Sequence, residues 1–300
     1  MNITRIKYCL IVIIPVVMMI AGCEKPPGIS IPESKWKQGQ GDLSDTIGSG
    51  DYSYNFRTPD EPISLPLNSS LEKTEYDKPT EKWFGKIGYG IPLGTMRAGE
   101  VYTVSLFGHE KNGTVINRDI RMQLTKRKDF YKKKELITKD TVHVDTVKGE
   151  ETIYISDLPH VENTSYLFSM EVLDVNGKVE DTLVGFIYVP KLEMNAEMRM
   201  DQDVYSQSDD EATLTLENSG PTILSFGEGY VIEKKVNDSW KTVPLNYDHI
   251  DIGIYMDPGD HYEWTIGIAQ LDSGHYRTVK TFSAGGLDLT ATLAAEFKIN

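Results

Sequence analysis

The sequence has 300 residues, 39% of them hydrophobic, with 31 Lys and Arg against 45 Asp and Glu and a formal net charge of −14. This acidic balance favours solubility and disfavours nucleic acid as a partner, because like charges repel. The length is sufficient for domains of about 100 residues, which can bury enough surface to fold without disulfides.

Residues 1–22 have the layout of an export signal: Arg5 and Lys7 precede an apolar run that ends in small residues. A transmembrane anchor is the competing interpretation, but it needs about 20 apolar residues, and this run is shorter and contains Pro15. The run closes with Ile20-Ala21-Gly22-Cys23, which resembles the lipobox of bacterial lipoproteins. An ordinary signal with an incidental cysteine is the alternative.

The lipobox resemblance implies cleavage before Cys23, a diacylglycerol on its thiol and acylation of the new amino terminus. Two or more acyl chains hold a protein stably on a membrane. We therefore expect a lipid-anchored protein of the bacterial cell envelope, on the surface or the periplasmic face. Cys9 would leave with the signal, and Cys23 is the only other cysteine. The folded part would then contain no disulfide, thiolate nucleophile or cysteine zinc site, and its 29 basic and 45 acidic residues would give a net charge of −16.

Residues 23–57 are rich in Pro, Gly, Ser and Asp and have no sustained periodicity. This composition is typical of a flexible tether between an anchor and a folded body. Trp36 is interpreted as a lone aromatic within the tether, with contact to lipid headgroups as the alternative.

Residues 58–190 show short runs of period-2 alternation, which predict strands. In the run 101–107, Tyr102, Val104 and Leu106 share one face. In the run 166–172, four apolar residues alternate with Ser169 and Glu171, which are expected on the opposite face. Asn176-Gly177 predicts a tight hairpin turn before a return strand at 184–190.

One segment of this first body, residues 125–135, is strongly basic against the acidic background. Its cations are Lys126, Arg127, Lys128, Lys132, Lys133 and Lys134. They could form a patch that contacts an anionic surface polymer or lipid headgroups. The preferred interpretation is a solvated strand edge, where lysines discourage pairing between sheets.

The pattern breaks at 190–195, the expected linker, and a second body follows at 196–300. Its runs 212–218, 261–268 and 290–299 again alternate, placing for example Leu214, Trp264 and Leu293 on inward faces. Residues 229–245 read as two strands around Asn237-Asp238-Ser239. Short strands with frequent turn signals predict an all-β protein made of two tandem immunoglobulin-like β-sandwiches.

The second body resembles a bacterial Ig-like domain found in exported and lipid-anchored proteins. The resemblance rests on Glu217-Asn218-Ser219, Phe226-Gly227, Tyr230 to Lys234, Trp240, Pro258-Gly259, Gly274 to Lys280 and the closing AEFKI. It implies a fold and no catalytic residues. Gly227 and Gly259 suit turns, Trp240 and Tyr276 suit the core, and Arg277 and Lys280 are expected to face outward or pair with acids. The first body is expected to be a further Ig or fibronectin-type sandwich by pattern alone.

The sequence contains no strong signature of chemistry. The six histidines lack metal-ligand spacing: His109, His143, His160, His249, His261 and His275. A calcium site between the domains is a minor possibility, carried by Asp201, Asp203, Asp209, Asp210 and Glu211. We expect no catalytic residue, cofactor or metal, and the ligand-binding residues stay unknown.

The function expected is therefore a non-enzymatic binding or structural module of the cell envelope, anchored through Cys23 and directed at an unidentified protein or glycan. One alternative is a glycan-binding accessory lipoprotein in which Trp83, Phe84 and Tyr89 stack on sugars. Another is a hydrolase within residues 58–190.

Overall fold

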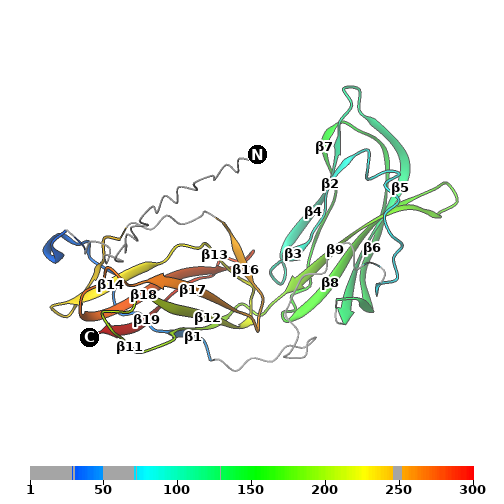
Figure 1. The fold of residues 1–300 in the computed structure, drawn as a ribbon. Helices are drawn as coiled ribbons and strands as arrows, with labels where there is room; N and C mark the ends of the chain where they lie inside the picture. Colours follow the sequence, from blue (N-terminus) through cyan, green and yellow to red (C-terminus); the bar gives the residue numbers. More distant parts are fainter. Residues whose placement is uncertain (1–28, 30, 50–70, 72, 129, 246–251) are drawn as a thin grey trace, which may run out of the picture.

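The computed structural model describes residues 29, 31–49, 71, 73–128, 130–245 and 252–300 and is all-β (Figure 1). In this part of the chain the helical structure is of the 3-10 type, at η1 (Glu33–Lys35) and at residues 71 and 73. No helix among these residues is long and apolar enough to cross a bilayer. The expected signal (1–22) and Cys23 lie outside the described residues. The fold is two β-sandwiches, so the predicted fold class is confirmed.

The N-terminal sandwich packs a sheet ordered β2-β4-β7 against a sheet ordered β3-β9-β8-β5-β6. Its strands are β2 (Gly88–Gly90), β3 (Gly94–Thr95), β4 (Val101–Gly108), β5 (Thr114–Lys128), β6 (Lys132–Val147), β7 (Gly149–Asp157), β8 (Thr164–Leu173) and β9 (Val179–Val189). The alternating residues Tyr102, Val104 and Leu106 are buried between the sheets as predicted. Gly177 takes a positive φ of 78° in the β8–β9 turn, where Asn176-Gly177 predicted a hairpin.

The outer face of the five-stranded sheet is covered, which the alternation did not predict. Ser169 and Glu171 lie on this face, opposite the apolar residues as predicted, but they are 0% and 6% exposed. Leu71 packs on this face in a cluster with Leu167, Phe186 and Tyr188, and the Glu171 carboxylate accepts hydrogen bonds from Arg121 and Gln123. The outer face is therefore buried by contacts with distant parts of the chain, which the local pattern does not reveal.

The C-terminal sandwich packs a sheet ordered β1-β10-β12-β17 against one ordered β11-β19-β18-β13-β16, with the β14–β15 hairpin joined to β18. Its strands are β1 (Thr46–Ile47), β10 (Met194–Met200), β11 (Val204–Tyr205), β12 (Glu211–Pro221), β13 (Leu224–Phe226), β14 (Val231–Val236), β15 (Ser239–Thr242), β16 (Ile254–Met256), β17 (His261–Gly267), β18 (Gly274–Ala284) and β19 (Thr290–Ile299). Leu214, Trp264 and Leu293 are buried as predicted. Asn237 and Asp238 take positive φ angles in the β14–β15 turn, which suits a tight hairpin.

Residues 31–49 are part of this C-terminal sandwich, so the prediction of a flexible tether across 23–57 is wrong for them. β1 pairs antiparallel with β10 at the edge of the four-stranded sheet. Trp36 is 8% exposed, packs in the core of the C-terminal sandwich and donates its indole N–H to the Ile31 carbonyl at 2.8 Å. The N-terminal sandwich is thus inserted between two parts of the chain that fold together.

A buried ion pair holds the incoming segment. Glu233 and Arg277 face each other across β14 and β18, and both are 1% exposed. The Arg277 guanidinium donates to Glu233 Oε2 at 2.6 Å and to the carbonyls of Gln40 and Gly41, while Glu233 Oε1 accepts the Gln40 N–H. A Cβ on Gly39 would lie 2.7 Å from the Glu233 carboxylate, so this glycine permits close approach. Residues 39–41, whose composition resembles that of a tether, therefore pack tightly against Glu233 and Arg277.

Two cations expected to face outward or to pair with acids, Arg277 and Lys280, are both buried. Arg277 pairs with an acid, which was one of the two expectations for it. Lys280 is 3% exposed and donates to the carbonyls of Gly227 and Gly229, so its expected outward or acid-paired position is wrong. Burial lowers the pKa of Lys280 to about 8.

The two sandwiches touch where β3 and β9 end. Tyr188 is fully buried and donates its hydroxyl to the Pro221 carbonyl at 2.7 Å. Arg97 pairs with Asp288 at 2.8 Å at the surface. η1 and the first described residues lie at the other end of the C-terminal sandwich, away from the N-terminal one (Figure 1).

Candidate anion-binding site

The predicted basic segment forms one end of the long β5–β6 hairpin, and β6 is an edge strand of its sheet. Phe130, in the turn, has a φ of 60° and is 4% exposed. It packs on Tyr188, with ring centroids 6.2 Å apart, within the cluster on the outer face of the sheet. The turn is thus fixed to the sandwich by an aromatic anchor, and the cations around it have defined positions.

Arg127 has a structural role at this turn. Its guanidinium makes a bidentate pair with Glu75, at 2.7 and 2.9 Å, and also donates to the Tyr131 carbonyl and to Thr125 Oγ1. Arg127 is 3% exposed. Burial opposes ionisation of Glu75, but the hydrogen bonds from Arg127 prevail and hold the pKa of Glu75 below its usual value. The positive charge of Arg127 is therefore compensated.

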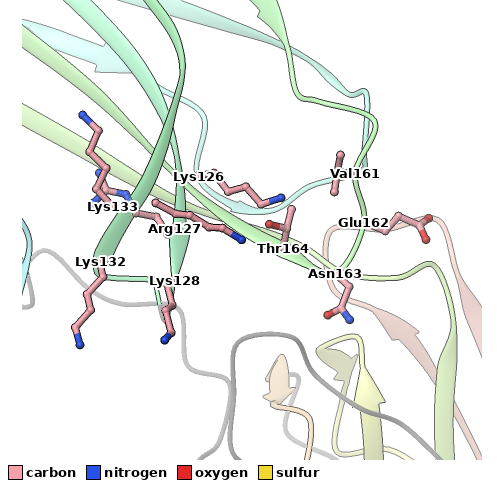
Figure 2. Close-up of a pocket in the computed structure, with 10 residues that line it drawn as sticks. Lys126, Arg127, Lys128, Lys132, Lys133, Val161, Glu162, Asn163 and Thr164 are labelled. Carbon is pink, nitrogen blue, oxygen red and sulfur yellow. The ribbon is translucent and has the colours of Figure 1, made fainter.

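The remaining cations of the segment face a concavity of about 700 Å³. Lys126 is half-buried, and the other four lysines are exposed: Lys128, Lys132, Lys133 and Lys134. The opposite wall is Val161 to Thr164, from the connection between β7 and β8. Its one acid, Glu162, points away from the hairpin, whereas Lys128 and Lys132 extend side by side from the turn (Figure 2). The basic concavity, as we call this site, is suited to an anionic group.

The register of the hairpin places like charges opposite each other. Lys128 faces Lys132, whereas Lys126 faces Glu135, and the charge of Arg127, opposite Lys133, is compensated by Glu75. Directly opposed like charges destabilise an antiparallel pair by about 0.2–1 kcal/mol. Local rules are usually broken where a site is functional, so the retained repulsion favours a ligand-binding role. An edge position also agrees with the preferred sequence interpretation, in which the lysines protect the sheet edge.

Two of the five acidic residues considered for calcium, Asp201 and Asp209, make hydrogen bonds within the fold. Asp201 accepts the Tyr205 hydroxyl at 2.7 Å and the Thr213 N–H at 2.6 Å. Asp209 accepts the Ser206 N–H at 2.8 Å. Across the described ranges, no three His, Cys, Asp or Glu residues gather as metal ligands do. His143 lies on the surface, with Nδ1 2.7 Å from Asp119 and Nε2 3.3 Å from Asp145. The hydrogen bond to Asp119, and to a smaller degree the one to Asp145, raises the pKa of His143.

The three aromatics considered for sugar stacking do not form a common exposed platform. Phe84 is 8% exposed and packs in the core between the sheets. Tyr89, 41% exposed, meets its ring edge to face, with an interplanar angle of 76°. The Trp83 indole N–H donates to Glu180 at 3.0 Å, and the Arg118 guanidinium lies over its ring. Hydrogen bonds from Lys82 and Arg118 lower the pKa of Glu180 to about 2. These contacts fix the segment before β2 to the sheet.

Comparison with protein families bears on the C-terminal sandwich. Residues 192–298 match the family model of the bacterial Ig-like domain. The match agrees with the family resemblance read from the sequence. In the matched residues, Trp240 and Tyr276 are buried and Gly259 takes a φ of 91°, as the resemblance implied. No curated protein matches the chain.

The chain also has low similarity to several solved structures. They include red sea bream transglutaminase, at 10% identity and a TM-score of 0.30, covering 72% of this chain and 31% of the enzyme. Fibronectin(III)-like modules of Clostridium thermocellum CbhA match at 14% identity and 0.29, covering 71% of this chain and 94% of the modules. Native E. coli alpha-2-macroglobulin matches at 11% and 0.26, covering 71% of this chain and 16% of that protein. These likenesses carry no argument about function.

The sequence thus identified one wall of the basic concavity and missed the other. All six predicted cations line it, although Arg127 is engaged elsewhere. Val161 to Thr164 carry no motif, and only the β7–β8 crossover brings them opposite the hairpin. Positive φ at Asn163, 51°, is the one local feature of that wall that departs from ordinary backbone.

Proposed function

We propose that this protein is a lipid-anchored, non-enzymatic binding module of the bacterial cell envelope, and that the basic concavity binds an anionic polymer of the envelope. The observation that carries the ligand class is the concavity itself, which five lysines line on one side and whose opposite wall has one acid, Glu162, that points away. A chain with 45 acidic residues has no general affinity for anions, so a local excess of cations selects for a specific contact.

The anchor rests on the lipobox at Ile20 to Cys23 and on the resemblance of this order to bacterial lipoproteins. The Ig-like sandwich supports a binding or structural role, since such folds carry their ligands on loops and strand edges. The cluster of Trp83, Phe84 and Tyr89 gives a glycan-stacking role little support, because Phe84 is buried.

The ligand class is tested with two probes of different chemistry, long-chain inorganic polyphosphate and polyglutamate, titrated against the protein at low and physiological salt. We expect the variant Lys128→Ala/Lys132→Ala to bind about tenfold more weakly than the native protein, and binding to weaken with salt. The matched control is Lys111→Ala/Lys139→Ala, which removes two exposed lysines outside the concavity.

Folding does not confound this comparison. Lys128 and Lys132 oppose each other, so their removal should leave the urea midpoint unchanged or raise it slightly. If the Lys128/Lys132 variant binds both polymers as the native protein does but self-associates, the lysines protect a sheet edge and the binding role is wrong. A preference between the probes identifies phosphate or carboxylate as the recognised group.

The anchor is tested separately by detergent partitioning. We expect native protein from bacterial membranes to enter the detergent phase and the Cys23→Ser form to remain in the aqueous phase. Equal partitioning of the two forms would contradict lipid attachment at Cys23.

A further inference from the structure

The part of the protein closest to the expected anchor is the C-terminal sandwich. Ile29 packs against its core, six residues after Cys23. Six residues span at most about 20 Å even when fully extended. A lipid on Cys23 would therefore hold this sandwich within about 20 Å of the bilayer, whereas the expected tether ending at residue 57 would have allowed a far larger distance.

The end of the sandwich next to Ile29 is rich in lysine. Residues 31–41 and 231–243 together carry five lysines and three acids. Two of those acids are engaged, Glu33 by Lys234 and Glu233 by Arg277. The other four lysines lie around η1 and the β14–β15 hairpin: Lys35, Lys37, Lys235 and Lys241.

Backbone contacts hold these lysines at one end of the molecule. Thr242 donates its N–H to the Lys37 carbonyl at 3.0 Å, and Gln38 forms a β-bridge with Lys241. Lys35 and Lys37 flank the buried Trp36, which fixes their backbone to the core. Ile31, 46% exposed, lies beside them in the chain as an apolar group. This end, the anchor-side patch, lies opposite the N-terminal sandwich (Figure 1).

We propose that the anchor-side patch docks on anionic lipid headgroups and gives the protein a second membrane contact beside its lipid. This inference rests on the proposed anchor at Cys23. Each lysine held near an anionic leaflet strengthens association about fivefold, and the effect is confined to roughly a Debye length. The short reach from Cys23 lets the patch come within that range, and two acids of the same end, Asp203 and Asp209, lie beside β11 at the opposite edge of the sheet. The N-terminal sandwich, with its basic concavity, is then presented outward.

The test uses native lipidated protein in two kinds of vesicle, pure phosphatidylcholine and phosphatidylcholine with one-third phosphatidylglycerol. Lysines are labelled with a membrane-impermeant amine reagent and quantified by mass spectrometry. We expect labelling of Lys35, Lys37, Lys235 and Lys241 to fall about fivefold on the anionic vesicles. Lys139 and Lys178, which are exposed on the N-terminal sandwich, serve as internal controls and should label equally on both.

A variant sharpens the result. Lys35→Gln/Lys37→Gln should reduce the protection of Lys235 and Lys241, while Lys139→Gln/Lys178→Gln should not. Both pairs are exposed, so neither variant should alter folding. Equal labelling on the two vesicles, in protein that partitions into detergent, overturns the docking and leaves the anchor intact. Protein that stays in the aqueous phase overturns the anchor, and the docking with it. Protection of Lys128 and Lys132 in place of the patch would overturn the outward orientation.

Discussion

Both sandwiches hold a non-strand segment with an arginine–glutamate pair, and the two pairs differ in their exposure to water. In the C-terminal sandwich Arg277 and Glu233 are both 1% exposed and fix residues 39–41. In the N-terminal sandwich Arg127 is equally buried, but the side chain of its partner Glu75 is 39% exposed. A carboxylate that stays in water contributes less and is lost at lower cost. The comparison indicates that the docking of residues 31–49 is the more strongly held of the two.

The largest effect is expected from Glu233→Gln. The substitution leaves the Arg277 guanidinium buried without a counter-charge, which typically costs about 3–5 kcal/mol. Urea unfolding should show this loss, and limited proteolysis should detect release of residues 31–49. Glu217→Gln is the control, because Glu217 pairs with Arg199 at the surface and should contribute at most about 1 kcal/mol. Similar losses in the two variants would show that the buried pair is not what holds the segment.

Trp36→Ala tests the same docking through packing. Truncation of a buried tryptophan typically costs about 3–5 kcal/mol, and we expect about 3 kcal/mol because Trp36 lies at the margin of the core. Hydrogen exchange should accelerate at β1 and at the β10 amides that pair with it. Ile31→Ala is the matched control, since Ile31 is 46% exposed. If β1 stays protected in the Trp36 variant, β1 holds its place independently of the tryptophan.

Glu75→Gln probes the more exposed pair. It removes the charge that compensates Arg127, but the guanidinium keeps its hydrogen bonds to the Tyr131 carbonyl and Thr125 Oγ1, and the carboxylate that is lost is 39% exposed, so we expect a loss of about 1–2 kcal/mol. Urea unfolding monitored by a probe in the N-terminal sandwich gives the measurement, with the exposed Glu150→Gln as control. If Glu75→Gln lowers the free energy of unfolding as much as Glu233→Gln does, the two ion pairs contribute equally despite their different exposure.

The strands and the inward residues were readable from the sequence because alternation is a local property of the chain. Leu214, Trp264 and Leu293 all point inward as their period predicts. The docking of residues 31–49 was not readable, because the partners of Trp36 and Gly39 lie about 200 residues away. Gly39 resembles a linker glycine until the Glu233 carboxylate is placed beside it.

The same distinction holds at the basic concavity. Its lysines form one contiguous segment with a conspicuous charge, so the sequence located them. The burial of Arg127 and the wall at Val161 to Thr164 depend on contacts between distant segments, with Glu75 in the first case and the β7–β8 crossover in the second. Composition located the cationic segment, and tertiary contacts determined which of its cations are engaged within the fold.

The smallest expected effect concerns Glu180, whose partners are surface cations. Hydrogen bonds from Lys82 and Arg118 lower its pKa to about 2, below the unfolded value of 4.5. A carboxyl with a depressed pKa stabilises the fold fully above its unfolded pKa, and the contribution is lost as pH falls through the folded value. Since the Lys82 side chain is 50% exposed, solvent screening reduces the contribution to about 1 kcal/mol. Urea unfolding should therefore separate Glu180→Gln from native protein by about 1 kcal/mol at pH 7, by progressively less as the pH falls from 4.5 to 2, and not at all well below pH 2. If the difference in unfolding free energy does not change with pH, the effect of Glu180 comes from its hydrogen bonds and not from its charge. The surface ion pairs of the N-terminal sandwich would then differ in kind from the buried pair of Glu233 and Arg277.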